Sequence, residues 1–353
     1  MKKMLVMCVV LVASFSSLFA QGTSEKESTG LPYEGETLTV SMWGYNMDIL
    51  EKNIITPFEE KYGCEIVVET GNNSDRLTKM VARKNNPIVD VALFAGSHTY
   101  KAKEAGVIKP YDPSLLTNLD AIMEEAKDPI GDMYGIGYSL SNLGLFYRSD
   151  KCDEITSWKD LLDPSYAGTV SVPTITTTYG PAFIYMLTKA FTGDFTNTEV
   201  GWQKLEELAP NLITAYSKSS ELNTLIAQEE VYIAPYSSFA WGSIASTGLD
   251  VAKAIPEEGL PGTFSIASVG AGTKNETLAN EFINWLISYD VQLNEALDQV
   301  DSPVRLDVEV PEEIAQNLAY GEELVSNLYF FDEAELAANQ EEWINRWNSI
   351  FSK

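Results

Sequence analysis

Apolar and polar residues alternate over residues 38–43 and again over 65–69, which predicts two β-strands. Between them, apolar residues recur at helical spacing over residues 47–62, so we expect a helix there, ended by Gly63. Pro57 lies inside this helix and should kink or split it, because proline lacks the N–H that the helix needs. A strand–helix–strand unit of this kind requires a parallel sheet.

The same two periods continue along the chain. They predict strands at residues 89–94, 169–172, 213–216, 231–234, 251–255 and 263–269. They predict helices at residues 74–83, 99–105, 182–191, 199–208, 221–228, 276–288, 311–328 and 333–352. Strands that alternate with helices indicate an α/β fold, in which ligands bind at the carboxyl ends of the parallel strands.

The N-terminus has the features of an export signal. Residues 1–20 combine two lysines, an apolar run and a small residue at Ala20, which is typical of a cleaved secretory signal peptide. Residues 21–36 are polar, and we expect them to form a disordered leader. No later stretch is long and apolar enough to cross a membrane. The roughly 330 remaining residues exceed one core of ordinary size, so we expect two lobes.

The net charge and the few histidine and cysteine residues limit the kinds of ligand and reaction that we expect. The chain has a net charge of −27, and loss of Lys2 and Lys3 with the signal peptide makes it more acidic still. This charge argues against nucleic-acid binding and attracts cations, although it also serves solubility alone. His98 is the only histidine, and we interpret it as a surface-loop residue, which argues against a zinc site and a Ser-His-Asp hydrolase. A disulfide between Cys64 and Cys152 is chemically allowed in an exported protein, but the sequence does not decide it.

Four stretches are more specific than their periodicity. They read PFEEKYG from Pro57, SWKDLLDPSYAG from Ser157, PEEG from Pro256 and KNETLANEFINW from Lys274. Together with the strand that ends at Trp43, they resemble the periplasmic solute-binding proteins of ABC importers, and among these the spermidine/putrescine-binding family.

The resemblance implies a two-lobed α/β periplasmic binding protein fold, type II-like, with a central mixed or parallel sheet flanked by helices in each lobe and a hinge between the lobes. Lobe one would comprise residues 37–141 and 266–303, and lobe two residues 142–265 and 304–353. The protein would capture a small polar solute in the interlobe cleft by hinge closure and deliver it to a membrane ABC permease complex. We expect a periplasmic monomer that is not an enzyme and has no cofactor, metal or nucleic-acid partner.

Five segments would converge on the ligand in such a fold: residues 43–46, 95–97, 174–179, 236–241 and 263–265. Their aromatic side chains can hold amines, enclose apolar stems, or simply form core between the lobes. The aromatic candidates are Trp43, Tyr45, Tyr179, Tyr236 and Trp241. The hydroxyl candidates are Ser97, Thr176, Thr177, Thr178, Ser238 and Ser265.

The threonines leave the identity of the solute open. They precede the helix that begins near Pro181, so they favour an oxyanion at its N-terminus, or else only satisfy the turn. The polyamine-binding family places carboxylates in this loop and near Ser265, whereas this chain has none there and would need Asp48 or Asp301 instead. We therefore keep two solutes: a polyamine, or an oxyanion-bearing amino-carboxylate, phosphonate or sugar phosphate. A ligand-sensing or adhesion module and an exported hydrolase are the alternatives of another class.

Overall fold

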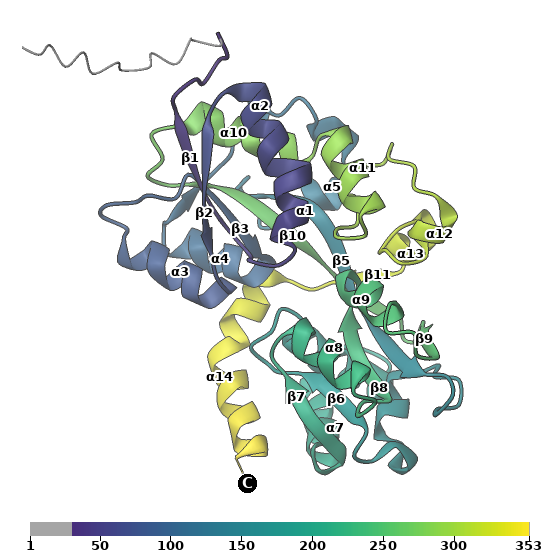
Figure 1. Cartoon of the computed structure of the whole chain (residues 1–353). Helices are drawn as coiled ribbons and strands as arrows, with labels where there is room; N and C mark the ends of the chain where they lie inside the picture. Colours follow the sequence, from purple (N-terminus) through teal and green to yellow (C-terminus); the bar gives the residue numbers. More distant parts are fainter. Residues whose placement is uncertain (1–29, 353) are drawn as a thin grey trace, which may run out of the picture.

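Two long antiparallel strands, β5 (Ile136–Arg148) and β10 (Leu260–Gly270), connect the two α/β lobes (Figure 1). The computed structural model describes residues 30–352, so the predicted signal peptide lies outside the described residues. The first half of β5 pairs with β10, whereas its second half pairs with two strands of the other lobe. One strand therefore belongs to both sheets, which confirms the two-lobed α/β fold.

The upper lobe in Figure 1, lobe one, is built on the predicted strand–helix–strand unit. Its strands are β1 (Thr37–Met42), β2 (Glu65–Thr70), β3 (Val91–Ala95) and β4 (Ile108–Lys109). β1 pairs in parallel with both β2 and β3, and β10 follows β3 in antiparallel orientation. The carboxyl ends of β1 and β3 therefore meet at one edge of the sheet.

Lobe two repeats this plan. Its strands are β6 (Val170–Pro173), β7 (Leu212–Tyr216), β8 (Ile233–Ser237) and β9 (Val251–Ala254). β6 pairs in parallel with β7 and β8, while β8 and β9 pair antiparallel with β5. The short β11 (Leu328–Phe330) adds to the start of β10.

Helices flank both sheets. Lobe one carries α1 (Met47–Leu50), α2 (Thr56–Tyr62), α3 (Asn73–Ala82), α4 (Gly96–Glu104), α5 (Glu124–Lys127), α10 (Glu276–Leu286) and α11 (Tyr289–Leu297). Lobe two carries α6 (Gly180–Thr192), α7 (Thr198–Leu208), α8 (Ser219–Ala227) and α9 (Trp241–Ala245). The chain ends with α12 (Glu312–Ala315), α13 (Glu322–Ser326) and α14 (Glu333–Phe351).

The helix around Pro57 is divided, as predicted. A π-helical turn, Glu51–Ile55, separates α1 from α2, and Pro57 lies in the first turn of α2. A proline has no N–H to donate and its ring crowds the preceding turn, and the wider π turn accommodates both effects.

Parts of three predicted ligand-binding segments belong to strands or helices. Residues 95–97 are not a loop, because β3 ends at Ala95 and α4 begins at Gly96. Residues 263–265 lie inside β10, in agreement with the strand predicted over residues 263–269, whereas residues 236–237 extend β8 beyond the strand predicted over residues 231–234. Pairing with β5 extends β8 beyond its short apolar run. His98 is buried in α4 rather than in a surface loop.

Two further expectations fail at the ends of the chain. The predicted helix over residues 311–328 is broken into α12, α13 and β11, and Gly321 between the two helices has a φ of +94°, which a helix cannot contain. Residues 30–36 of the predicted disordered leader are ordered, because the Tyr33 ring packs on the Tyr62 ring and its N–H donates to the Tyr62 carbonyl.

The two cysteines of the described chain are both free and buried. Cys64 precedes β2 in lobe one, whereas Cys152 follows β5 in lobe two. They lie in different lobes, so the disulfide that the sequence left open does not form.

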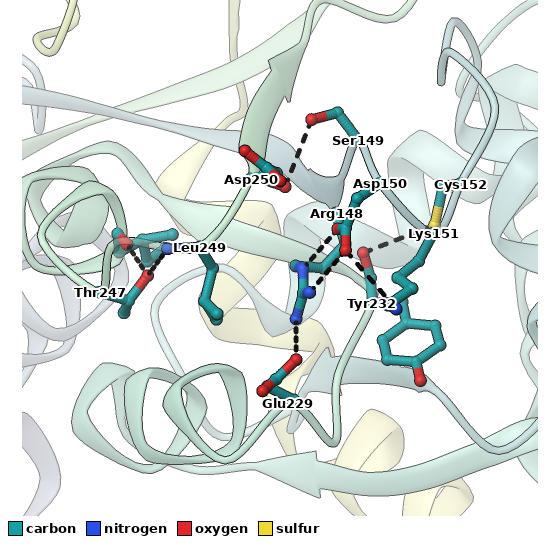
Figure 2. Close-up of polar contacts among 11 residues, drawn as sticks. Arg148, Ser149, Asp150, Lys151, Cys152, Glu229, Tyr232, Thr247, Leu249 and Asp250 are labelled. Carbon is teal, nitrogen blue, oxygen red and sulfur yellow. Dashed lines mark hydrogen bonds and ion pairs between the residues drawn. The ribbon is translucent and has the colours of Figure 1, made fainter.

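An arginine secures the far end of β5 in lobe two (Figure 2). Arg148 donates to both carboxylate oxygens of Asp150 at 2.8 Å and to Glu229 at 3.1 Å. The Ser149 N–H donates to the Asp250 carbonyl, just before β9. These contacts hold the end of β5 against the segments that lead into β8 and β9. They therefore fix β5, the strand that passes from lobe one to lobe two, within lobe two.

Candidate functional site

A row of residues crosses the sheet where lobe one meets lobe two. Ala95 at the end of β3, Ser265 in β10 and Ser139 in β5 are register partners. A β-bulge interrupts the register here, so Tyr138 and Ser139 together face Ser265. Bulges redirect side chains and are frequent beside functional sites. We therefore take this row as the floor of the candidate site.

A carboxylate lies on this row. Ser139 donates its hydroxyl to Asp301 at 2.8 Å, and an isolated bridge between Leu140 and Ser302 fixes the Asp301 loop beside β5. Burial raises the pKa of Asp301, against the effect of the Ser139 hydrogen bond. Asp301 makes no ion pair within the described part of the chain.

A tyrosine from lobe two reaches the same strand. The Tyr179 hydroxyl lies 2.6 Å from the Ser141 hydroxyl, and Tyr179 immediately precedes α6. Ser141 is two residues beyond Ser139, so both point to one face of β5, about 7 Å apart. Burial raises the pKa of Tyr179, which keeps its hydroxyl protonated. Lobe two therefore contributes to the same face of β5 as Asp301.

A second carboxylate enters from the C-terminal helix. A Cβ atom on Gly96 would lie 1.9 Å from Glu333 Oε1, so only glycine leaves room for this carboxylate. Gly96 is the first residue of α4, and Ala95, its N-cap, has no side chain that could cap the helix. Glu333 thus lies at the positive end of α4.

The rest of α14 is attached to lobe two. Tyr185 of α6 stacks on Phe331 at 4.6 Å and donates its hydroxyl to Glu335 at 2.5 Å. Further along, Arg346 forms a bidentate pair with Glu199 of α7. Helix α14 therefore joins lobe two to the start of α4 in lobe one, where Glu333 lies against Gly96, and Figure 1 shows this helix extending between the two lobes.

The charge state of Glu333 follows from its surroundings. Burial and the like charge of Asp332 raise the pKa of Glu333 to about 8. The helix end opposes this, but a helix terminus contributes only about 0.3–1 kcal/mol, which is less than one pKa unit. No lysine, arginine or histidine pairs with Glu333 among residues 30–352. Its carboxylate therefore has no counter-charge.

This pKa predicts a pH dependence of stability. Between the ordinary value of 4.5 and about 8, the folded protein holds the Glu333 proton while the unfolded chain loses it. The free energy of unfolding of the empty protein should therefore fall as the pH rises from 5.5 to 8, with Glu333 contributing up to about 3 kcal/mol. Urea unfolding at both pH values should show a smaller fall for Glu333→Gln, and an unchanged fall for Glu341→Gln on the exposed face of α14. Equal falls in the wild type and Glu333→Gln would contradict the assignment.

Aromatic rings complete the junction. Tyr45 of lobe one lies 5.9 Å from Phe239 of lobe two. The Trp43 ring covers the buried Arg76 guanidinium at 5.0 Å. Arg76 in turn donates to the Ser41 and Leu93 carbonyls, at the ends of β1 and β3. The ends of these strands and the Trp43 ring are thus held by one side chain.

Comparison with known proteins assigns this chain to a family. The family model of bacterial extracellular solute-binding proteins matches residues 53–321. The chain belongs to this family. Solute-binding proteins of ABC importers bind a small-molecule solute and work with a membrane permease, and they are not enzymes. The described part of the chain has no helix with the length and apolar character that a membrane span requires.

Three relatives show how far the similarity extends. A crystallised ABC transporter protein from Clostridium perfringens is 36% identical, with a TM-score of 0.77 over 89% of this chain and 99% of that chain. The putrescine-binding periplasmic protein PotF of Escherichia coli is 23% identical over 287 residues, which are 74% of this chain and 76% of PotF. The binding protein AfuA of Actinobacillus pleuropneumoniae, solved with fructose-6-phosphate, is 19% identical with a TM-score of 0.75, over 90% of this chain and 99% of that chain. The last likeness shows the fold alone.

Five of the residues that we predicted as ligand-binding lie at the junction of this solute-binding protein. They are Trp43, Tyr45, Ser97, Tyr179 and Ser265. The neighbouring threonines are part of the turn itself: Thr177 donates to the Thr174 carbonyl and accepts from the Gly180 N–H. Thr176 and Thr178 are exposed on that turn. Their part in ligand binding stays a prediction.

The other three predicted residues lie within lobe two. Tyr236 and Trp241 are buried in a hydrophobic cluster with Phe146 and Ile244 beneath α8 and α9. Ser238 accepts a hydrogen bond from the Asn142 N–H and so ties the end of β8 to the crossing strand. These contacts favour a structural role for all three.

The sequence interpretation omitted the acids from the site. Asp301 entered only as a possible substitute for missing carboxylates, and Glu333 did not enter at all. Glu333 has no distinguishing local signal, since it begins an ordinary amphipathic helix after an aspartate N-cap. Another buried acid, Glu295, does have a local sequence signal. It lies four residues after Val291, which places a carboxylate on the apolar face of α11.

Proposed function

We propose that this solute-binding protein captures a small solute with at least one ammonium group between its lobes, as a polyamine has, and presents it to an ABC permease. One observation carries the proposal. Asp301 and Glu333, from separate parts of the chain, bring carboxylates to the junction, and no basic side chain of the described residues pairs with them. An ammonium group is the ligand that such carboxylates lack.

Charge arithmetic disfavours the anionic alternative. A phosphate or carboxylate at the start of α4 would meet the Glu333 carboxyl group, which is protonated at neutral pH and would repel the anion once ionised, whereas an ammonium group stabilises the ionised form. The net charge of −27 adds a long-range attraction for cations. AfuA was solved with a sugar phosphate, so the fold admits anions, and the acids of this chain are what select against them.

The aromatic residues support the same conclusion. Tyr45 and Phe239 face each other from the two lobes at 5.9 Å, and Tyr45 is 38% exposed. Aromatic faces attract ammonium groups and also cover the methylene stem of an aliphatic amine. They therefore suit a flexible cationic chain better than a strongly hydrated anion.

Binding would act through hinge closure. We place the hinge in the middle of β5 and β10 and in the loop after α11, near the predicted lobe boundaries. Residues 304 and 306 exchange backbone hydrogen bonds with residues 121–123 of lobe one, so we place the last crossing beyond residue 306. A solute held by both lobes stabilises the closed state, because the open state has only half of its contacts. We expect export to the periplasm and a monomeric protein.

The test is direct ligand identification followed by calorimetry. Mass spectrometry of natively purified protein should release an amine, and titration should show binding of putrescine or spermidine that weakens with added salt. 4-Aminobutyrate and aminomethylphosphonate test the oxyanion alternative. Tight binding of fructose-6-phosphate or another anion without an ammonium group would overturn the proposal.

A further inference from the structure

Glu295 of α11 is a buried acid beside the site. Its side chain is only 3% exposed. Oε1 accepts a hydrogen bond from the Asn53 amide at 2.8 Å, whereas Oε2 is buried and has no hydrogen-bond partner among the described residues. An ionised carboxylate in this position loses its hydration and gains one donor, which costs several kcal/mol.

Asp301 lies next to this acid, and the two carboxylates titrate together. Burial and the charge of Asp301 raise the pKa of Glu295, and burial also raises the pKa of Asp301. Two carboxylates that share a poorly solvated site do not both ionise readily, so the pair retains one proton.

The surrounding groups do not neutralise the pair. Lys52 is two-thirds exposed and forms an ion pair with Asp298 at 2.7 Å, and Asn53 also donates to Asp298. From β5, Ser139 donates a hydrogen bond to Asp301. The charges of Asp301 and Glu295 raise the pKa of the neighbouring Tyr138, whose hydrogen-bond partner is Ser265 of β10. Arg76, a buried cation whose charge acts on Tyr138, donates to backbone carbonyls. Within the described residues, neither Glu295 nor Asp301 therefore forms an ion pair.

We propose that the Glu295–Asp301 pair holds one proton in the empty protein and exchanges it for an ammonium group of the solute, so that binding releases a proton. This inference rests on the proposed function, because it requires a cationic solute. The O–H bond of the shared carboxyl group breaks, its proton passes to solvent, and an N–H of the ammonium group donates to the carboxylate oxygen instead. Affinity should then fall up to tenfold for each pH unit of acidification while the empty pair is protonated.

The experiment is calorimetric titration of putrescine at pH 7 in phosphate and in Tris, two buffers with different heats of ionisation. Wild-type protein should give different heats in the two buffers, corresponding to release of up to one proton per putrescine from the pair, in addition to any proton that Glu333 releases. Glu295→Gln removes the carboxyl group whose pKa is raised by burial and by the charge of Asp301, so this variant should still bind putrescine but release up to one proton fewer than the wild type. Asp290→Asn, on the exposed face of the same helix, should behave like the wild type.

The outcomes separate the two proposals. If putrescine binds the wild type with equal heats in both buffers, the exchange is wrong and the proposed function stands. If no amine binds, the proposed function fails. Carbon NMR titration of the labelled carboxyl groups in the empty protein then tests separately whether the Glu295–Asp301 pair holds a proton. Two coupled titration steps in the wild type that become a single step in Glu295→Gln would show that the pair holds a proton. Independent titration of Glu295 and Asp301 would overturn the proposal. Thermal melting verifies that the variant folds.

Discussion

Asp301→Asn and Glu333→Gln should each weaken putrescine binding by roughly 10- to 150-fold, and the double substitution should abolish it at ordinary concentrations. Each change keeps the side-chain shape but removes the negative charge that faces the ammonium group. Loss of one charge-assisted hydrogen bond costs about 1.5–3 kcal/mol, which gives this range of affinity. Titration calorimetry at low salt measures both the affinity and the heat of binding.

Two controls make this result specific. Glu341→Gln removes a charge from the same helix, away from the junction, and should leave affinity unchanged. Thr177→Val tests the oxyanion alternative, since it removes a hydroxyl of the loop before α6, although that hydroxyl is already bonded within the turn. Putrescine affinity that survives both acid substitutions and falls with Thr177→Val would assign the site to the threonine loop instead.

Arg76→Met should lower the free energy of unfolding by about 3–5 kcal/mol. The Arg76 side chain is fully buried and donates to the carbonyls of Gly71, Ser41 and Leu93. Methionine fills a similar volume but leaves these acceptors without a donor, and each buried unsatisfied group costs about 1–3 kcal/mol. Chemical unfolding of the empty protein measures the loss.

The matched control is Arg83→Met, at the end of the same helix. Arg83 pairs with Glu69 at 2.5 Å but is 40% exposed, so its loss should cost no more than about 1 kcal/mol. Arg76→Met should also weaken ligand binding, because the Trp43 ring lies on the guanidinium and would shift with it. Equal stability of the two variants would show that the carbonyls find other partners.

Local periodicity was a reliable guide where an element is long and has one buried face. It predicted the strand–helix–strand unit that ends at β2, the disruption near Pro57 and helix α14. It was wrong at His98, which lies in α4 because this helix follows β3 without a loop.

By itself, the sequence determined the α/β class, the two lobes and the solute-binding family, because apolar spacing reports local backbone geometry and short motifs report the family. It also predicted ligand-binding segments at the ends of β1, β3 and β6. Only the tertiary structure decided which charges meet there. Gly96 and Glu333 lie 237 positions apart in the chain, and Glu295 and Asp301 converge through a helix end and the loop that follows it. Such proximity depends on strand order and lobe packing, which no local period encodes.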